Sequence, residues 1–198
     1  MSYSNDFLNE SIQIINQINS DEIENVVDVL VNLRSDGGRL FIIGSGGGSG
    51  HASHAVCDFR KLCGFEAYAP YDNISELTAR VNDEGWDVSL MNWLKGSRLS
   101  SKDGIFVFSV GGGDFSKNIS PNIVRALEYA KRLGSKVVGI VGKDGGYTKQ
   151  IGDAVVVIPV VNSSRITPHT EGFQALIWHL LVSHPRLQIN PTKWESTK

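Results

Sequence analysis

Two histidines and one carboxylate occupy one face of a predicted helix, at a spacing that suits chemistry. His51, His54 and Asp58 stand at positions i, i+3 and i+7. In a helix the β-carbons of His54 and Asp58 lie about 6 Å apart, close enough for a shared metal ion or a proton relay. Two ordinary polar residues on a solvated face explain the isolated pair equally well. Cys57, beside the pair, is either a third ligand or, more commonly for this residue type, a small buried side chain.

A glycine-rich segment, Gly44-Ser45-Gly46-Gly47-Gly48-Ser49-Gly50, leads directly into this helix. Glycines allow backbone N–H groups to approach an anion closely, and the helix N-terminus adds a favourable dipole. A tight strand-to-helix turn explains one or two of these glycines but not five, so the segment predicts a phosphate-binding loop. A dinucleotide is the minor alternative, with Glu66 where a ribose-binding acid would stand. That fingerprint needs glycines at offsets 0, 2 and 5, which no register here provides.

A second glycine-rich segment, Ser109-Val110-Gly111-Gly112-Gly113-Asp114, follows another apolar run. Two backbone-rich loops at neighbouring strand ends suit a ligand that is both phosphorylated and polyhydroxylated. The carboxylate of Asp114 repels phosphate, so we expect it either to cap a turn or to accept hydrogen bonds from sugar hydroxyls.

The last predicted helix carries Glu171 and His179. Each has a structural explanation when taken alone. Acids such as Glu171 favour the first turn of a helix. His179 stands between Trp178 and Leu180, where a core histidine with a satisfied hydrogen bond is the more common interpretation.

Apolar runs alternating with helical patterns predict the elements that position these residues. Short continuous apolar runs are typical of strands covered on both faces of a parallel sheet. Their alternation with helices predicts a three-layer doubly wound α/β fold, in which ligands bind beyond the carboxyl ends of the strands. The predicted strands are 40–43, 105–108, 137–141 and 154–158, with 65–69 as a weaker fifth, and the predicted helices are 51–63, 86–94, 121–133 and 171–183.

Two helical segments precede the first strand. Leu8, Ile12 and Ile15 recur at helical spacing in the first, and a second apolar stripe extends from Ile23 to Leu33. Because both segments stand outside the alternating unit, we expect an arm that buries its apolar stripes against other copies of the chain. Within one domain spanning 1–198, the expected parts are this arm over 1–36, the α/β core over 39–185 and a polar, extended tail over 186–198.

Composition excludes several classes of protein. The 198 residues carry a formal charge of −2, which gives no reason to expect nucleic acid or an anionic membrane as a partner. No apolar run approaches the roughly 20 residues that span a bilayer, and the polar N-terminus is unlike a secretory signal. Cys57 and Cys63 are the only cysteines and form no CxxC pair, which is typical of a reduced, cytoplasmic protein.

Taken in chain order, these segments resemble the SIS (sugar isomerase) domain family, and within it the phosphoheptose (sedoheptulose 7-phosphate) isomerases. The family's motifs are a glycine loop followed by His and Glu, a Leu-Thr-Ala…Asn-Asp-x-Gly segment, and a Gln with a His eight residues later. The matching segments here are Gly44–Gly48 with His54 and Asp58, Leu77–Gly85, and Glu171 with His179. The similarity extends over nearly the whole chain, to about Pro185.

The resemblance implies a flavodoxin-like five-stranded parallel sheet and a homotetramer with sites at subunit interfaces. It implies aldose–ketose isomerisation of sedoheptulose 7-phosphate to D-glycero-D-manno-heptose 7-phosphate through a cis-enediol, for heptose and surface-polysaccharide biosynthesis. Zinc, or another divalent metal, is expected on His54, Asp58, Glu171 and His179. Asp58 and Glu171 are the expected carboxylate bases, and His179 the proton relay. The implied substrate contacts are Ser45, Gly46, Gly47, Asn82, Asp83, Ser109, Val110, Gly111 and Asp114.

The implied ligand set places a geometric condition on the last helix. Residues eight apart are about 12 Å apart along the axis of a continuous helix. Glu171 and His179 therefore reach one metal only if Glu171 lies in an irregular start of that helix.

Three positions depart from the family's pattern. Asp58 replaces Glu and is one methylene shorter, and Glu171 replaces Gln and adds a negative charge. The second loop has Val110, Gly111 and Asp114 where the family's phosphate-gripping loop is rich in Ser and Thr. This altered loop favours the alternative function, a non-catalytic sugar-phosphate sensor or assembly protein on the same fold. The four metal-site residues favour the enzyme.

Overall fold

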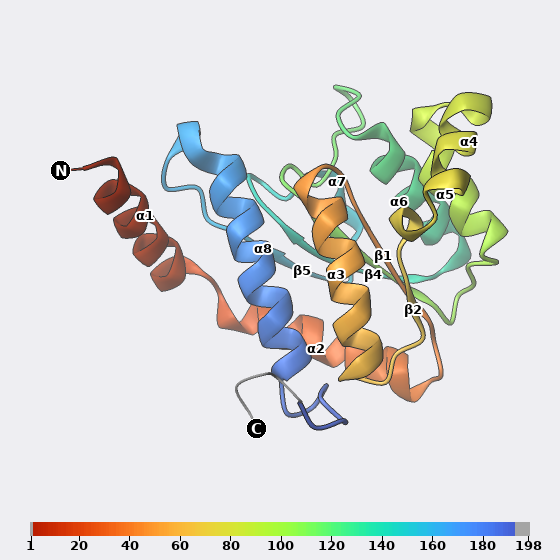
Figure 1. Ribbon diagram of the computed structural model, residues 1–198, viewed down its shortest axis with the longest axis horizontal. Coiled ribbons are helices and arrows are strands. Elements are labelled where there is room, and N and C mark those ends of the chain that lie inside the picture. The colour runs from red at the N-terminus through yellow and green to blue at the C-terminus, as the bar shows by residue number, and fades with distance from the viewer. Residues whose placement is uncertain (1, 193–198) are drawn as a thin grey trace.

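The computed structural model describes residues 2–192, which form one parallel sheet with helices on both faces (Figure 1). The strand order is β2-β1-β3-β4-β5, and each neighbouring pair is parallel. This is the flavodoxin-like order, so the predicted fold class and five-stranded sheet are confirmed. The strands are β1 (Leu40–Gly44), β2 (Ala67–Tyr68), β3 (Gly104–Ser109), β4 (Lys136–Val141) and β5 (Ala154–Val157).

Alternation along the strands produces two cores. In β1, Leu40 and Ile42 pack into one core, and Phe41 and Ile43 into the other, as the period-two geometry of a strand requires. The helices that cover the first face are α2 (Ser20–Ser35), α3 (Gly47–Lys61) and α8 (Ile166–Ser183), and those on the second are α5 (Trp86–Gly96), α6 (Pro121–Leu133) and α7 (Gly146–Ile151). The three-layer prediction is thereby confirmed.

Several helices differ from the expected ones, and α3 begins at Gly47, four residues before its expected start. The last helix begins at Ile166, five residues before the expected start, and continues without interruption to Ser183. Two further helices were not predicted: α4 (Ile74–Glu84), which buries none of its residues, and the six-residue α7. Helix α7 is too short to show a helical period. The apolar residues of α4, Ile74, Leu77 and Val81, do recur at helical spacing, but none of them is buried.

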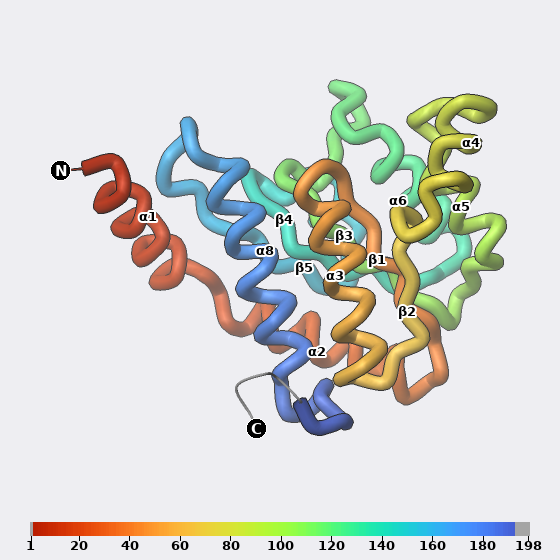
Figure 2. Tube along the Cα trace, viewed as in Figure 1, coloured from red at the N-terminus to blue at the C-terminus, as the bar shows by residue number. Residues whose placement is uncertain are grey.

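The expectation for the N-terminal arm is wrong for its second helix. The apolar stripe of α2, from Ile23 to Leu33, is buried in this chain's own core. The first helix, α1 (Tyr3–Gln17), does project from the body of the molecule (Figure 2). Leu8, Ile12 and Ile15 on α1 are all more than half exposed, so of the two helices of the expected arm, α1 is the one with an uncovered apolar face.

The first residues of the tail also differ from the extended polar segment that was expected. Leu187 is fully buried, and Arg34 on α2 donates hydrogen bonds to the carbonyls of Arg186 and Leu187. The last six residues of the predicted tail, 193–198, lie outside the described residues. None of the helices in the described range is long and apolar enough to cross a membrane.

Candidate metal and substrate site

The carboxyl ends of β1 and β3 define the place where a ligand is expected. The strand that follows β1 in the chain, β2, lies on one side of β1, and the next strand, β3, lies on its other side. Doubly wound folds bind ligands at such a switch point. The first glycine-rich segment follows β1 and the second follows β3, so both predicted loops lie at this edge of the sheet.

Two helices beside this edge bring three predicted metal ligands together. His54 and Asp58 lie on α3, and His179 lies on α8, which packs beside α3 on the same face of the sheet (Figure 1). One ligand atom from each of these residues lies within 4.8 Å of the other two. The spacing predicted for His54 and Asp58 therefore does place them at one site, and His179 joins them from a distant part of the chain.

Asp58 is the least accessible member of this group. Its exposure is 4%, and no residue of the described chain donates a hydrogen bond to its carboxylate. A buried carboxylate without a hydrogen bond or a cation is costly. A bound divalent cation would remove that cost, so Asp58 fits a metal ligand.

The orientation of His179 also fits a metal ligand. Its Nδ1 lies 2.8 Å from the Ala175 carbonyl oxygen. A carbonyl only accepts, so Nδ1 carries the proton and Nε2 keeps its lone pair. Metal-binding histidines are typically fixed in this way through their second nitrogen. The His54 ring lies edge-on to Trp178 at 4.8 Å and to His179 at 5.5 Å between ring centroids.

Glu171 lies apart from these three residues. Since α8 is continuous from Ile166, Glu171 is in its second turn and not in an irregular start, so the condition for sharing the metal with His179 is not met. A β-carbon built on Gly47 would lie 2.4 Å from the Glu171 carboxyl carbon. The carboxylate therefore rests against the first residue of α3. Cys57 is exposed and also lies outside the three-residue group.

His51 lies next to Glu171, although it was not among the predicted site residues. Burial lowers the pKa of its ring, and the nearby Glu171 carboxylate and backbone carbonyl oppose that shift. His54 and His179 act on the same ring and lower its pKa further. The helical spacing of His51, His54 and Asp58 in the sequence was the feature that indicated it.

The first glycine loop is shaped by close approaches. Gly46 has a φ of +57°, which favours glycine, and a β-carbon on Gly48 would lie 2.3 Å from the Phe108 carbonyl oxygen. The Tyr71 hydroxyl bonds to both backbone groups of Gly44, accepting from its N–H at 2.9 Å and donating to its carbonyl. The Ser45 hydroxyl oxygen is enclosed and has no hydrogen-bond partner among the described residues. A ligand hydroxyl or phosphate oxygen would satisfy it.

In the second glycine loop, the polar side chains form hydrogen bonds within the loop itself. Ser109 Oγ accepts a hydrogen bond from the Gly112 N–H at 3.0 Å. Asp114 accepts from the Ser116 hydroxyl and from the Ser116 and Lys117 N–H groups. These hydrogen bonds, chiefly the one from the Ser116 side chain, lower the pKa of Asp114. Of the two roles expected for Asp114, the structure shows the turn cap.

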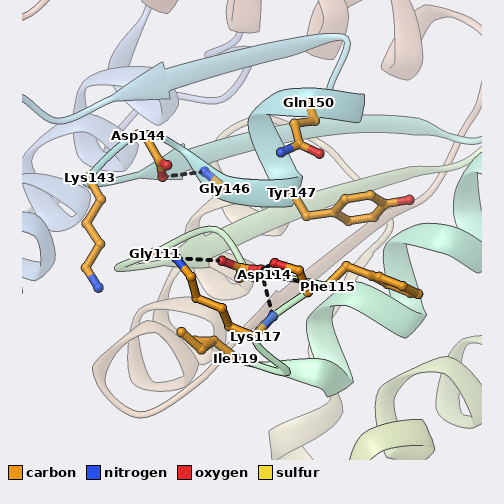
Figure 3. Close-up of a pocket in the computed structure, with 12 residues that line it drawn as sticks. Gly111, Asp114, Phe115, Lys117, Ile119, Lys143, Asp144, Gly146, Tyr147 and Gln150 are labelled. Atoms are coloured by element: carbon orange, nitrogen blue, oxygen red, sulfur yellow. Dashed lines mark hydrogen bonds and ion pairs between the residues drawn. The ribbon is translucent and has the colours of Figure 1, made fainter.

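A cavity of about 600 Å³ opens beside this loop (Figure 3). Its walls come from the second glycine loop and from the segment between β4 and α7. Lys143 and Lys117 both line it. A β-carbon on Gly111 would lie 3.9 Å from the Lys143 ammonium nitrogen. Lys143 was missed from the sequence, although Gly142-Lys143-Asp144-Gly145-Gly146 is a third glycine-rich segment after an apolar run.

Asn82 and Asp83 are not joined to the glycine loops by any hydrogen bond or cavity within residues 2–192. Both are exposed on α4, and the Asn82 amide donates to the Asp83 carboxylate at 2.8 Å. Their expected contact with substrate stays a prediction. Val110, also an expected contact, is half-buried and offers only its backbone.

Comparison with known proteins agrees with the resemblance found in the sequence. The family model for the SIS domain matches residues 5–142. The chain belongs to the SIS domain family. Its relatives include a phosphoheptose isomerase from a Nitratiruptor species, which is 30% identical over 150 residues, 73% of this chain and 74% of that protein. The predicted kinship with phosphoheptose isomerases is thereby confirmed.

Solved structures share the fold at lower sequence identity. The phosphoheptose isomerase GmhA from Neisseria gonorrhoeae has a TM-score of 0.76 at 21% identity, covering 90% of this chain and 94% of that chain. The sugar isomerase domain of an RpiR transcription factor from Sphaerobacter thermophilus has a TM-score of 0.57 at 15% identity, covering 92% and 89%. The fold therefore occurs in proteins described as an enzyme and as a regulator.

Proposed function

We propose that this chain interconverts sedoheptulose 7-phosphate and D-glycero-D-manno-heptose 7-phosphate through a cis-enediol. Isomerase relatives that match about three quarters of the chain support this reaction class. The observation that carries the proposal is the group formed by His54, Asp58 and His179, whose ligand atoms lie within 4.8 Å of one another. Two imidazoles and a buried carboxylate suit zinc, with other divalent metals as the alternative.

Each residue of this group has one defined task in the proposed reaction. Asp58, His54 and His179 hold the metal, and the Ala175 carbonyl fixes the His179 ring so that Nε2 is the binding nitrogen. A divalent metal held by these residues would supply positive charge beside the substrate carbonyl and so make the neighbouring carbon more acidic. The enclosed Ser45 hydroxyl and the backbone of Gly46 and Gly47 bind the sugar at the same end of the sheet.

The phosphate end of the substrate is proposed to bind beside the second loop. That loop provides Ser109, Val110 and Gly111 mainly through backbone groups, because the Ser109 oxygen already accepts an internal bond. The ammonium groups of Lys143 and Lys117 line the adjoining cavity. We propose that these cations replace the hydroxyl groups of the usual Ser- and Thr-rich loop, since ammonium groups bind phosphate by charge.

We also propose a cytoplasmic homotetramer that acts in heptose and surface-polysaccharide biosynthesis. The exposed face of α1 supports association with other copies. Sites at subunit interfaces would give the exposed Asn82 and Asp83 a substrate to contact on a neighbouring copy. A sugar phosphate is the expected partner, and neither nucleic acid nor membrane is.

Metal analysis of freshly purified protein tests the metal centre. His54→Ala or His179→Ala should lower bound zinc well below one per site and abolish conversion of the sugar phosphate, while His184→Ala, at the far end of α8, should change neither. If the unmutated protein holds no metal and chelators leave turnover unchanged, the metal centre is wrong.

One observation favours the second candidate, a sugar-phosphate sensor. The side chains of Ser109 and Asp114 are already used within their own loop, so the phosphate grip differs from that of the family. A sensor would bind sedoheptulose 7-phosphate without converting it, and Asp58→Asn would leave that binding intact. Calorimetric titration combined with NMR of the sugar therefore separates the two functions.

A further inference from the structure

One end of the cavity beside the second glycine loop is aromatic. Phe115, from the loop, and Tyr147, on α7, line this end, and the Lys143 side chain lies at the other (Figure 3). Phe115 is 59% exposed, which is unusual for so large an apolar side chain without a partner. Every carbon of the proposed substrate carries an oxygen atom, and its phosphate is its only charged group. The proposed reaction therefore uses the cationic end of the cavity and leaves the aromatic end without a role.

Backbone contacts join the two walls of the cavity, which are the second loop and the segment between β4 and α7. The Tyr147 N–H donates to the Gly113 carbonyl at 2.8 Å. Thr148 donates to the Gly112 carbonyl from both its N–H, at 2.9 Å, and its hydroxyl, at 2.7 Å. A β-carbon on Gly112 would clash with the Gly145 carbonyl oxygen. Because the walls are already joined, a ligand binds here without the cost of ordering them.

The cationic end of the cavity carries a charge that its walls do not neutralise. Lys143 forms no ion pair with any carboxylate of residues 2–192. The two carboxylates that line the cavity are already hydrogen-bonded, Asp114 within its own loop and Asp144 to the Gly146 N–H at 3.1 Å. The φ of Lys143 is +54°, in the left-handed region, where a lysine is strained and a glycine is not. Strain of this kind is commonly found at binding sites.

An aromatic surface, a free amide and an unpaired cation in one cavity suit an adenine nucleotide. Nucleobases stack on aromatic side chains, and lysine binds phosphate by charge. The side-chain amide of Gln150 also lines the cavity and has no hydrogen-bond partner within residues 2–192. A glutamine amide donates to and accepts from the edge of adenine at the same time. The volume of about 600 Å³ is typical of a site for a small organic ligand.

We propose that this cavity binds an adenine nucleotide, with the base against Phe115 and Tyr147 and the 5′-phosphate on Lys143. The nucleotide is a regulatory ligand and undergoes no reaction there. This inference rests on the function proposed above in one respect, because Lys143 was assigned to the phosphate of the substrate. The nucleotide and the sugar phosphate then compete for the same ammonium group, so the nucleotide inhibits the isomerisation.

Calorimetric titration with adenosine 5′-monophosphate tests the site, with ribose 5-phosphate as the reference ligand that lacks the base. Stacking of a base on an aromatic side chain changes affinity by about 5- to 150-fold, so we expect the nucleotide to bind more tightly by that factor. Phe115→Leu and Tyr147→Leu keep an apolar side chain without a ring. Each should lower affinity for the nucleotide at least fivefold and leave that for ribose 5-phosphate unchanged. Trp86→Leu, which removes an exposed ring outside the cavity, is the matched control.

Inhibition kinetics with sedoheptulose 7-phosphate test the competition. Adenosine 5′-monophosphate should raise KM and leave kcat unchanged, and Phe115→Leu should raise the ratio of the inhibition constant to KM at least fivefold. Three results would each overturn the inference: equal affinity for the nucleotide and ribose 5-phosphate, no binding of either, or nucleotide binding that neither leucine variant weakens. If the nucleotide binds as expected but the unmutated protein converts no sugar phosphate, the isomerase function fails and the nucleotide site stands.

Discussion

Replacing Gly47 of the first glycine loop with alanine should lower turnover without lowering the stability of the fold. A β-carbon on Gly47 would lie 2.4 Å from the Glu171 carboxylate, whereas one on Gly50, in the same helix, would meet nothing within 4 Å. Glu171 can rotate away, so neither Gly47→Ala nor Gly50→Ala should destabilise the fold, and either should raise its stability by up to about 1 kcal/mol. Displacing the carboxylate by an ångström should cost about 10²-fold in turnover for Gly47→Ala alone. Equal turnover in the two variants, measured beside their thermal unfolding, would contradict the part in the reaction that the family resemblance implies for Glu171.

The cavity beside the second loop leads to a prediction about phosphate affinity. Lys143 lines this cavity, and Lys149, on α7, does not. Hydrogen bonds to charged groups contribute about 1.5–3 kcal/mol, or about 10- to 100-fold in affinity. Lys143→Gln should therefore raise KM for the sugar phosphate by that factor with little change in kcat, and Lys149→Gln should leave both constants unchanged. Steady-state kinetics at two salt concentrations would check this, and indistinguishable KM values would place the phosphate elsewhere.

Single residues show where prediction from the sequence succeeds and where it ends. The pairing of His54 with Asp58 follows from helical spacing alone, and His179 joins them as the family resemblance implies. The separation of Glu171 from that group depends on where α8 begins, and helix starts are fixed by tertiary contacts as much as by local sequence. Lys143 was missed because neither periodicity nor the quoted motifs include it.

At the scale of elements, one carboxylate fastens α1 to the rest of the chain. Glu10 accepts hydrogen bonds from Arg165 and Asn162 and lies 2.8 Å from His169 Nε2. The Arg165 hydrogen bonds, followed by those of Asn162 and His169, hold the pKa of Glu10 far below its ordinary value of 4.5. The stabilisation of α1 by the ionised Glu10 carboxylate is therefore complete above about pH 4.5. It is lost progressively as the pH falls toward that lowered pKa.

Glu10→Gln should loosen α1 at neutral pH without unfolding the sheet. We expect lower hydrogen-exchange protection for the amides of α1 and unchanged protection for β1 and β3. The wild type should lose α1 protection as the pH falls below 4.5, whereas the variant should show little further loss. Asp6→Asn, on the same helix, is the control. Equal protection of α1 in Glu10→Gln and wild type would show that the apolar contacts alone hold it.

The strands were more predictable than the helices for a physical reason. Strands covered on both faces must be apolar throughout, so β1, β3, β4 and β5 are visible as continuous runs. Helix α2 was assigned to the arm because it precedes the sheet, yet its stripe fills the core below β4 and β5. An apolar stripe indicates that one face of a helix is buried, but it does not indicate which surface covers that face.

At the scale of the whole molecule, the uncovered apolar face predicts self-association. Leu8, Ile12 and Ile15 on α1 are 61%, 55% and 55% exposed, and Leu176 and Leu180 of α8 are also exposed. Several exposed apolar side chains on one helix are typical of an interface. Ile12→Glu should convert the proposed tetramer to smaller species in light scattering at micromolar concentration, and Ile189→Glu, near the C-terminus, should not. A monomeric wild type would contradict the assembly.

Proton exchange with solvent tests the central claim, that this SIS-domain chain is a metal-assisted isomerase, most directly. Zinc-loaded protein is mixed with sedoheptulose 7-phosphate in deuterated water and followed by NMR. We predict that deuterium enters at the carbon beside the carbonyl, that the aldose heptose 7-phosphate appears, and that both stop after chelation or in His54→Ala. If no deuterium enters the sugar phosphate although the protein binds it, the chain is not an isomerase of this substrate and the sensor function takes its place.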